Sequence, residues 1–165
     1  MKTILGLIPR VKSPALPVLC LILVSGCASL AGPTTSAERY MACPMESVWG
    51  GALEALNQYP VITQDREKGI IKTDWRTVPV QGRPYGLFGR EGLGDKERSR
   101  LTMTLKPLND GVIHVQLDER RQHWGFRGGQ QIYTWYPVEP SQESLDQIMG
   151  TLTTKLEAEG CVFES

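Results

Sequence analysis

The sequence predicts an α+β fold: a two-layer sandwich in which an antiparallel sheet of four to five strands is covered on one face by an N-terminal and a C-terminal helix. Two patterns lead to this prediction. Apolar residues recur at spacings of three and four in 44–59 and in 140–156, and they alternate with polar residues in the strands between. One-sided alternation is typical of antiparallel sheets with one wet face, so both helices are expected on the other face.

The first helix is expected to begin at Pro44, because proline suits the first helical position, where its missing N–H would be unpaired anyway. Glu46 in the first turn complements the helix dipole, and Pro60 ends the segment. The apolar stripe of this helix comprises Val48, Trp49, Ala52, Leu53, Ala55, Leu56 and Tyr59.

The segments with strand character lie at 61–63, 70–76, 101–105, 113–118 and 132–136. Asn109-Asp110-Gly111 is expected to join the third and fourth as a hairpin, because Asp-Gly tolerates the positive φ that tight turns require. In the second segment, alternation groups Ile71, Thr73 and Trp75 on one face. The other face of that strand then carries Ile70, Lys72, Asp74 and Arg76.

The last helix is expected to open at 140–141 and to stop before Gly160, which fits the position where left-handed geometry is common. Its apolar stripe comprises Leu145, Ile148, Met149, Leu152 and Leu156. Two irregular stretches are expected, over 79–95 and over 123–130.

The N-terminal segment ends in Leu23-Val24-Ser25-Gly26 before Cys27, which resembles the lipobox of bacterial lipoproteins. The resemblance implies cleavage before Cys27 and diacylation of its thiol. The upstream apolar core, 15–24, is too short to span a bilayer as a permanent helix but suits a signal peptide. An ordinary signal peptide or a short anchor is the alternative.

These observations predict three parts: a lipoprotein signal peptide over 1–26, the lipidated Cys27 with a flexible tether over 27–42, and a single periplasmic α+β domain over 43–165. Ala28 and Ser29 follow the lipidated cysteine without an aspartate. In enterobacterial-type lipoproteins that pattern implies the outer membrane, with the domain facing the periplasm and the lipid as its membrane partner.

Charge and cysteines narrow the function classes. The chain has 18 basic and 18 acidic residues, and three basic ones lie in the signal, which leaves 15 against 18 after cleavage. This acidic balance lacks the electrostatic footprint of a nucleic-acid binder. Cys43 and Cys161 remain after cleavage and lipidation, and in an oxidising compartment they are expected to form a disulfide. Buried free thiols or a thiol nucleophile are the alternatives, although no CxxC motif is present.

A helix with Trp49, a strand ending Thr73-Asp74-Trp75 and a charged segment, 97–100, follow the lipobox. Over about 44–158 this pattern resembles the BamC-like domains of Gram-negative outer-membrane lipoproteins. The resemblance implies a helix-grip type sandwich and a non-catalytic envelope protein that works through protein contacts.

Two glycine-rich segments are the candidate partner-binding sites. The first, 82–94, lacks both GxxxxGK[ST] and the βαβ context of a dinucleotide site, and its alternative is a plain hairpin connection. Its candidate residues are Arg83, Tyr85, Leu87, Phe88 and Arg90, types that anchor protein interfaces. The second, 122–129, offers Trp124, Phe126 and Arg127; the alternative is a structural turn whose rings tuck into the sheet edge.

The uncovered sheet face is expected to carry a mixed set of polar residues: Lys72, Asp74, Arg76, Thr102, Thr104, His114, Gln116, Asp118 and Arg120. Asp74, Asp118 and His114 allow a small hydrolase as the weakest hypothesis. No GxSxG or HExxH motif occurs, and His114 and His123 lack zinc-ligand spacing. No catalytic residue, metal ligand or cofactor is therefore expected.

The sequence thus favours a membrane-anchored periplasmic lipoprotein that acts as a protein-interaction or envelope-assembly accessory module and is not an enzyme. The alternative is a ligand-binding module that holds a cell-wall fragment or lipid between the long loop and the last helix.

Overall fold

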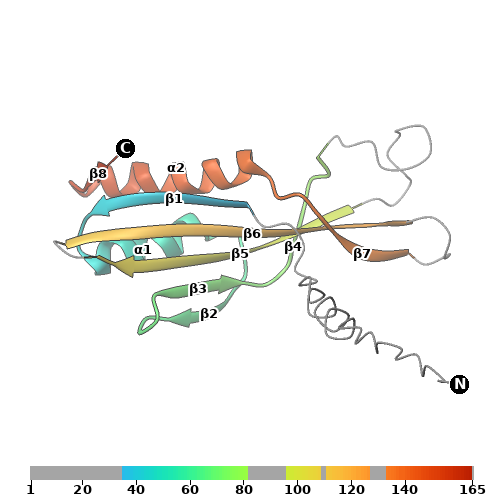
Figure 1. Cartoon of the computed structure of the whole chain (residues 1–165), viewed down its shortest axis with the longest axis horizontal. Coiled ribbons are helices and arrows are strands. Elements are labelled where there is room, and N and C mark those ends of the chain that lie inside the picture. Colours follow the sequence, from blue (N-terminus) through green and yellow to red (C-terminus); the bar gives the residue numbers. More distant parts are fainter. Residues whose placement is uncertain (1–34, 82–95, 109–110, 127–132, 165) are drawn as a thin grey trace, which may run out of the picture. The chain divides into compact units, whose positions relative to one another are not determined.

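The computed structural model describes residues 35–81, 96–108, 111–126 and 133–164. The chain divides into a unit of residues 1–31, outside the described ranges, and a unit of residues 32–165. In chain order the elements are β1 (Thr35–Ala42), α1 (Met45–Ala55), β2 (Val61–Asp65), β3 (Ile70–Thr73), β4 (Arg76–Val78), β5 (Lys96–Pro107), β6 (Val112–Phe126), β7 (Tyr133–Val138), α2 (Gln142–Ala158) and β8 (Val162–Glu164) (Figure 1).

The strands form one antiparallel sheet. Six of them follow the order β2-β3-β5-β6-β1-β8, while β4 pairs with β5 and β7 pairs with β6 outside this path. The two helices pack on each other, and both contribute to one core with the inward side chains of the sheet. The predicted α+β class is confirmed. The predicted strand number is too low, because the described residues form a sheet of eight strands.

The long strand β5 pairs with β6 along its whole length, from Lys96↔Trp124 to Pro107↔Ile113. At one end their outer neighbours are β3 and β1, and the helices cover this part. At the other end the neighbours are β4 and β7, which pair with the start of β5 and the end of β6. We call this second part the arm; Figure 1 shows it extending beyond the two helices.

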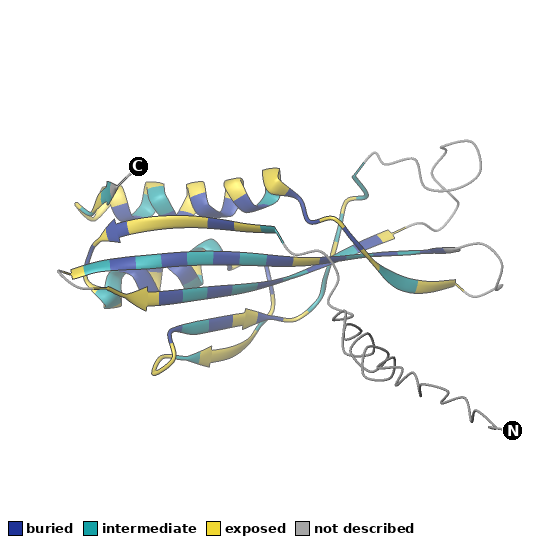
Figure 2. Cartoon of the chain, in the orientation of Figure 1, coloured by how far each residue is buried: buried dark blue, intermediate teal, exposed yellow. Residues whose placement is uncertain are grey.

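Burial alternates strictly along β5 and most of β6, as the banding in Figure 2 shows. Met103, Leu105, Val115 and Leu117 face the helices and are fully buried or nearly so. The same inward row becomes polar toward the arm, where Glu119 is fully buried. Apolar alternation therefore identifies the covered part of the sheet but not the arm.

The predicted tether over 27–42 is wrong for its last eight residues, which form β1. This strand lies between β6 and β8 and pairs with β6 from Thr35↔Glu119 to Ala42↔Val112. Ala37 and Met41 point into the core, whereas Glu38, Arg39 and Tyr40 between them are exposed. Only two inward apolar residues in eight explain why composition alone indicated a tether.

The predicted strand 70–76 is interrupted, which changes the face of its last residues. Lys72 lies opposite Thr102, but Arg76 lies opposite Ser99, one residue out of that register. A one-residue shift moves side chains to the other face of a sheet. Arg76 therefore leaves the predicted open face, and Trp75 leaves the face of Ile71 and Thr73.

Local hydrogen bonds satisfy the backbone where the ladder breaks. The Leu101 N–H donates to the Thr73 hydroxyl at 2.9 Å, and the Asp74 N–H donates to the Pro60 carbonyl at 2.8 Å. The interruption is thus stabilised by side-chain and loop partners, as buried backbone groups require.

The helix boundaries are close to those expected. The first helix ends a turn early, at Ala55, although Leu56 and Tyr59 are still buried. In α2, the Ser141 hydroxyl caps the N-terminus by accepting from the Ser144 N–H at 3.2 Å. Gly160 follows the helix with φ +84°, as expected. No helix among the described residues has the length and apolar character needed to cross a bilayer.

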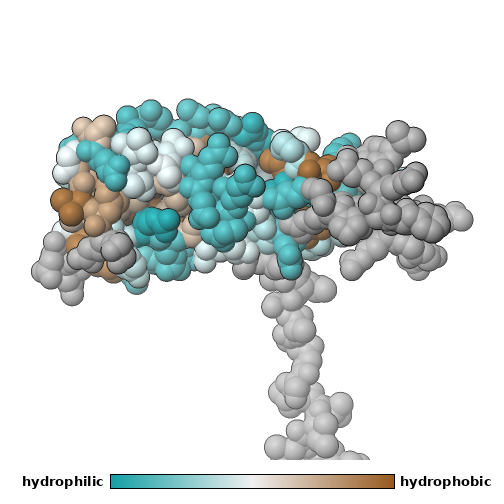
Figure 3. All heavy atoms as spheres, turned by 90° about the horizontal axis from the view of Figure 1, so that it is seen from above, coloured by the Kyte–Doolittle hydropathy of each residue, from teal (hydrophilic) through white to brown (hydrophobic). Residues whose placement is uncertain are grey.

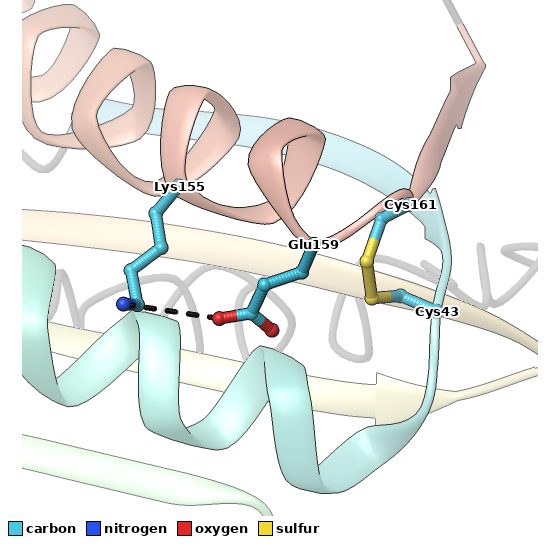
Figure 4. The surroundings of a disulfide bond; sticks show 4 residues. All are labelled: Cys43, Lys155, Glu159 and Cys161. Atoms are coloured by element: carbon cyan, nitrogen blue, oxygen red, sulfur yellow. Dashed lines mark ion pairs between the residues drawn. A yellow bond between two sulfur atoms is a disulfide. The ribbon is translucent and has the colours of Figure 1, made fainter.

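The predicted disulfide is confirmed: Cys43 and Cys161 are bonded, with their Cα atoms 5.1 Å apart (Figure 4). The neighbouring residues Ala42 and Val162 are partners in the β1–β8 ladder, so the bridge continues that pairing by one residue. Nearby, Glu54 and then Glu159 raise the pKa of Lys155, which lies 2.6 Å from the Glu54 carboxylate.

Candidate functional site

The outward face of the arm gathers aromatic rings and cations. We call this the aromatic–cationic face, and it comprises Trp75, Lys96, Arg98, Arg100, Trp124, Tyr133 and Trp135. The rings of Trp124 and Trp135 lie 5.4 Å apart, centroid to centroid, and the ring of Tyr133 lies 6.4 Å from that of Trp124. Tyr133 is about half exposed, at 52 %.

Arg98 is the centre of this face. Its guanidinium carbon lies 4.4 Å from the Trp75 ring centroid and 4.1 Å from that of Trp135. Its Nε and one terminal nitrogen donate to the Gln122 side-chain oxygen at 2.9 and 2.7 Å. Burial is the main cause that lowers the pKa of Arg98, and the positive charge of the neighbouring Arg100 lowers it further. The carboxylate of Asp74 acts in the opposite direction. The rings thus replace part of the water around this cation.

Strand register builds the face from sequence-distant residues. Lys96, Trp124 and Trp135 are directly paired across β5, β6 and β7. The ammonium of Lys96 lies 5.5 Å from the Trp124 ring centroid and 5.9 Å from that of Trp135. Cross-strand neighbours of this kind stabilise a sheet and present one continuous surface.

The inward face of the arm holds buried charges. Arg121 donates from Nε to Glu97, and its terminal nitrogens lie 2.8 Å from the Pro79 carbonyl oxygen and 3.5 Å from a Glu119 oxygen. The other Glu119 oxygen accepts from the Ser141 N–H at 2.6 Å, at the start of α2. Paired charges of this kind satisfy the usual condition for burying ionised groups, and they join β5, β6, 79–81 and α2.

Beside this cluster lies a cavity of about 650 Å³. Its walls come from the C-terminal end of α1 with the turn after it, from the N-terminal half of α2, and from 76–81; Arg121 also lines it.

Figure 3 views the fold from the side on which α2 lies in Figure 1, and the surface seen there is mostly hydrophilic. Hydrophobic residues gather at the end that carries β8, where Val162 is exposed.

Of the residues predicted to bind a partner, Trp124 lies on the aromatic–cationic face. The prediction that 123–130 is irregular is wrong for 123–126, which belong to β6, and Phe126 pairs there with Tyr133. The remaining candidates lie outside the described residues: Arg83, Tyr85, Leu87, Phe88, Arg90 and Arg127.

The residues of the hydrolase hypothesis are not brought together. Asp118 is on β6 and accepts from Gln116, whereas Asp74 follows β3, with β5 between those two strands. His114 lies 3.2 Å from the Glu38 carboxylate and stacks on Tyr40, toward the other end of β6. Within the described ranges, no three His, Cys, Asp or Glu side chains are arranged to hold a metal ion.

Sequence reasoning missed most of the face and the buried cluster. The signal was present: continuing the alternation of 101–105 back to residue 97 separates Glu97 and Ser99 from Arg98 and Arg100. Continuing the alternation of 113–118 forward to residue 122 separates Glu119 and Arg121, which face inward, from Arg120 and Gln122, which face outward. The extension required knowing that polar residues fill the inward row of the arm.

No protein-family model matches this chain, and no curated protein matches it. Solved structures with some likeness include a DUF4468 family protein from Bacteroides ovatus, at 13 % identity, covering 78 % of this chain and 82 % of that chain, with a TM-score of 0.37. An uncharacterised protein from Bacillus thuringiensis has 12 % identity, coverage of 76 % and 95 %, and a TM-score of 0.29. The protein XoxI from Bacillus cereus has 12 % identity, coverage of 76 % and 97 %, and a TM-score of 0.31. Likenesses of this strength carry no argument about function.

Proposed function

We propose that this protein is a lipid-anchored, outer-membrane lipoprotein whose periplasmic domain acts by binding another envelope protein rather than by catalysis. The observation that carries the proposal is the aromatic–cationic face, with Arg98 held between Trp75 and Trp135. Tryptophan, tyrosine and arginine are the residue types that most often dominate binding energy at protein interfaces.

The chemistry of the face indicates the kind of partner. Lys96, Arg98 and Arg100 bring three positive charges, and Asp74 is the carboxylate that acts on Arg98. The ring contacts fix the side chains before binding, which reduces the entropy lost on association. We therefore propose a partner surface with exposed carboxylates and a flat apolar area for the tryptophan rings.

The lipid on Cys27 would hold the face close to its partner. Eight residue steps separate Cys27 from Thr35, where β1 begins, and at about 3.5 Å per residue they reach at most about 28 Å. The domain would stay near the membrane, and tethering raises the effective concentration of a membrane-bound partner.

Radiolabelled palmitate should label the native chain, and Cys27→Ser should remove the label while Cys43→Ser does not.

The binding surface is tested by photo-crosslinking in intact cells. A benzoylphenylalanine in place of Tyr133, 52 % exposed, should crosslink to one defined envelope protein. The same replacement at Tyr40, 41 % exposed and on β1, is the matched control and should not. Equal products from both positions, or none from Tyr133, would contradict the proposal.

The charge of the face is tested with two lysines of the same strand. Lys96→Glu should reduce the crosslink from position 133 by roughly tenfold or more, because it opposes an acidic partner. Lys106→Glu, an exposed position at the other end of β5, changes the net charge equally and should leave the yield unchanged. If both variants act alike, the effect is one of net charge and the proposed surface is wrong.

A further inference from the structure

The cavity beside Arg121 has the size and walls of a small-molecule site. Its volume of about 650 Å³ lies within the range of roughly 300–1,000 Å³ found for ligand sites. It opens between α1, α2 and 76–81 on the helix side of the sheet. The aromatic–cationic face lies on the opposite side, because side chains alternate between the faces of a strand.

Arg121 supplies oriented hydrogen-bond donors in this cavity. Its side chain is 4 % exposed, and its contacts with Glu97, Glu119 and the Pro79 carbonyl hold the guanidinium in place. A guanidinium has five N–H groups, and these three contacts with described residues leave about two of them for a ligand. The two buried carboxylates already balance its charge, so an anionic ligand would gain little there.

The walls of the cavity carry uncharged polar groups that both donate and accept hydrogen bonds. Asn57, Gln58 and Gln147 carry amides, and Ser144 and Thr151 carry hydroxyls. Amides and hydroxyls both donate and accept hydrogen bonds, as the hydroxyl groups of a ligand also do.

The walls carry two acidic residues, Glu54 and Glu143, and two basic residues, Arg76 and Arg121. Glu54 pairs with Lys155 at 2.6 Å, and Arg76 donates to Gln58 at 3.2 Å and covers the Tyr59 ring. Val78, Val80 and Ile148 add apolar surface. The cavity is therefore amphipathic without a strong excess of either charge.

We propose that this cavity binds a short uncharged saccharide. Sugar rings present apolar C–H surfaces together with many hydroxyls, which matches a lining of valine, isoleucine, amides and a fixed guanidinium. A fatty acyl chain would bury Arg121 against hydrocarbon and leave its remaining donors unpaired, which is costly. The proposal concerns the helix side of the sheet and is independent of the protein-binding surface proposed above.

The test uses the full lipoprotein in nanodiscs and saturation-transfer NMR with three uncharged disaccharides: N,N′-diacetylchitobiose, cellobiose and maltose. At least one should bind with a Kd of about 1 mM or tighter. Inorganic phosphate and laurate, added as competitors, should not displace it. If all three sugars fail to bind, or if phosphate or laurate displaces them, the proposal is overturned.

Two tryptophan substitutions on α2 locate the binding. Thr151 lines the cavity, and Thr151→Trp should fill it and weaken sugar binding by about tenfold or more. Thr154 is exposed on the same helix and is not part of the lining, so Thr154→Trp is the matched control and should bind normally. Gln147→Leu, which removes an amide from the wall, should weaken binding as well. Binding that survives Thr151→Trp and Gln147→Leu in folded protein places the sugar elsewhere and refutes the site.

Discussion

At the scale of single residues, Arg98 is held by more contacts than its position near the surface suggests. Two tryptophan rings and the Gln122 side-chain oxygen surround one guanidinium. The residues of this arrangement come from three segments that are far apart in the sequence: Trp75 follows β3, Arg98 is on β5 and Trp135 is on β7. The arrangement therefore links the stability of the arm to the surface proposed for binding.

Arg98→Ala should destabilise the fold by about 1–3 kcal/mol, because it removes two cation–π contacts and a charged hydrogen bond. Urea unfolding monitored by tryptophan fluorescence measures the change. Arg100→Ala is the matched control, since within the described part of the chain Arg100 contacts one ring, that of Trp75 at 4.8 Å. It should cost less than about 1 kcal/mol. Equal effects of the two substitutions would show that holding Arg98 between two tryptophan rings adds no stability.

At the scale of elements, the turn between β2 and β3 lies close against β5. Gly69 lies in the turn between β2 and β3 with φ +63°, and its carbonyl accepts from the Leu105 N–H at 2.7 Å. A Cβ added at Gly69 would lie 2.0 Å from the Leu105 carbonyl oxygen. Only glycine allows this turn to approach β5 so closely, because every other residue has a Cβ.

Gly69→Ala should destabilise the protein by roughly 2–4 kcal/mol, combining left-handed strain with disruption of the hydrogen bond to Leu105. Gly111→Ala is the matched control: its φ is +78°, but a Cβ there meets nothing within 4 Å. The control should cost only about 1–2 kcal/mol. Thermal unfolding followed by circular dichroism compares the two, and a Gly69 variant no worse than the Gly111 variant would contradict the close approach.

At the scale of the whole molecule, the disulfide joins the two ends of the folded unit across 118 residues of sequence. Closing a loop of that length restricts the unfolded chain and stabilises the fold by about 4–5 kcal/mol in the chain-entropy model. The bridge also fixes β8 beside β1, at the edge of the sheet.

The double variant Cys43→Ser and Cys161→Ser should therefore unfold at a clearly lower urea concentration, by an amount equivalent to roughly 2–5 kcal/mol. The native protein should show the same loss after reduction with dithiothreitol, whereas the double variant should not respond to the reductant. A native protein that is indifferent to reduction would show that the bridge adds no stability.

The sequence by itself determined the α+β class, the positions of the two helices to within about a turn, and the pairing of Cys43 with Cys161. It also predicted the antiparallel pairing of β5 with β6, whereas the predicted turn residues Asn109 and Asp110 lie outside the described residues. Each of these depends on local periodicity, on turn chemistry or on a count of residues. The positive φ of Gly111 and Gly160, at the expected turn and helix end, follows from the same local preferences.

Tertiary structure alone decided the placement of β1, the shift at Arg76 and the two faces of the arm. Thr35–Ala42 has few apolar residues and is a strand because β6 and β8 supply its hydrogen-bond partners. Arg76 faces the cavity because a single irregularity in pairing reverses the alternation. Trp75, Arg98 and Trp135 meet only through the pairing of distant strands. Those contacts depend on register between segments far apart in the chain, and local sequence does not encode that register.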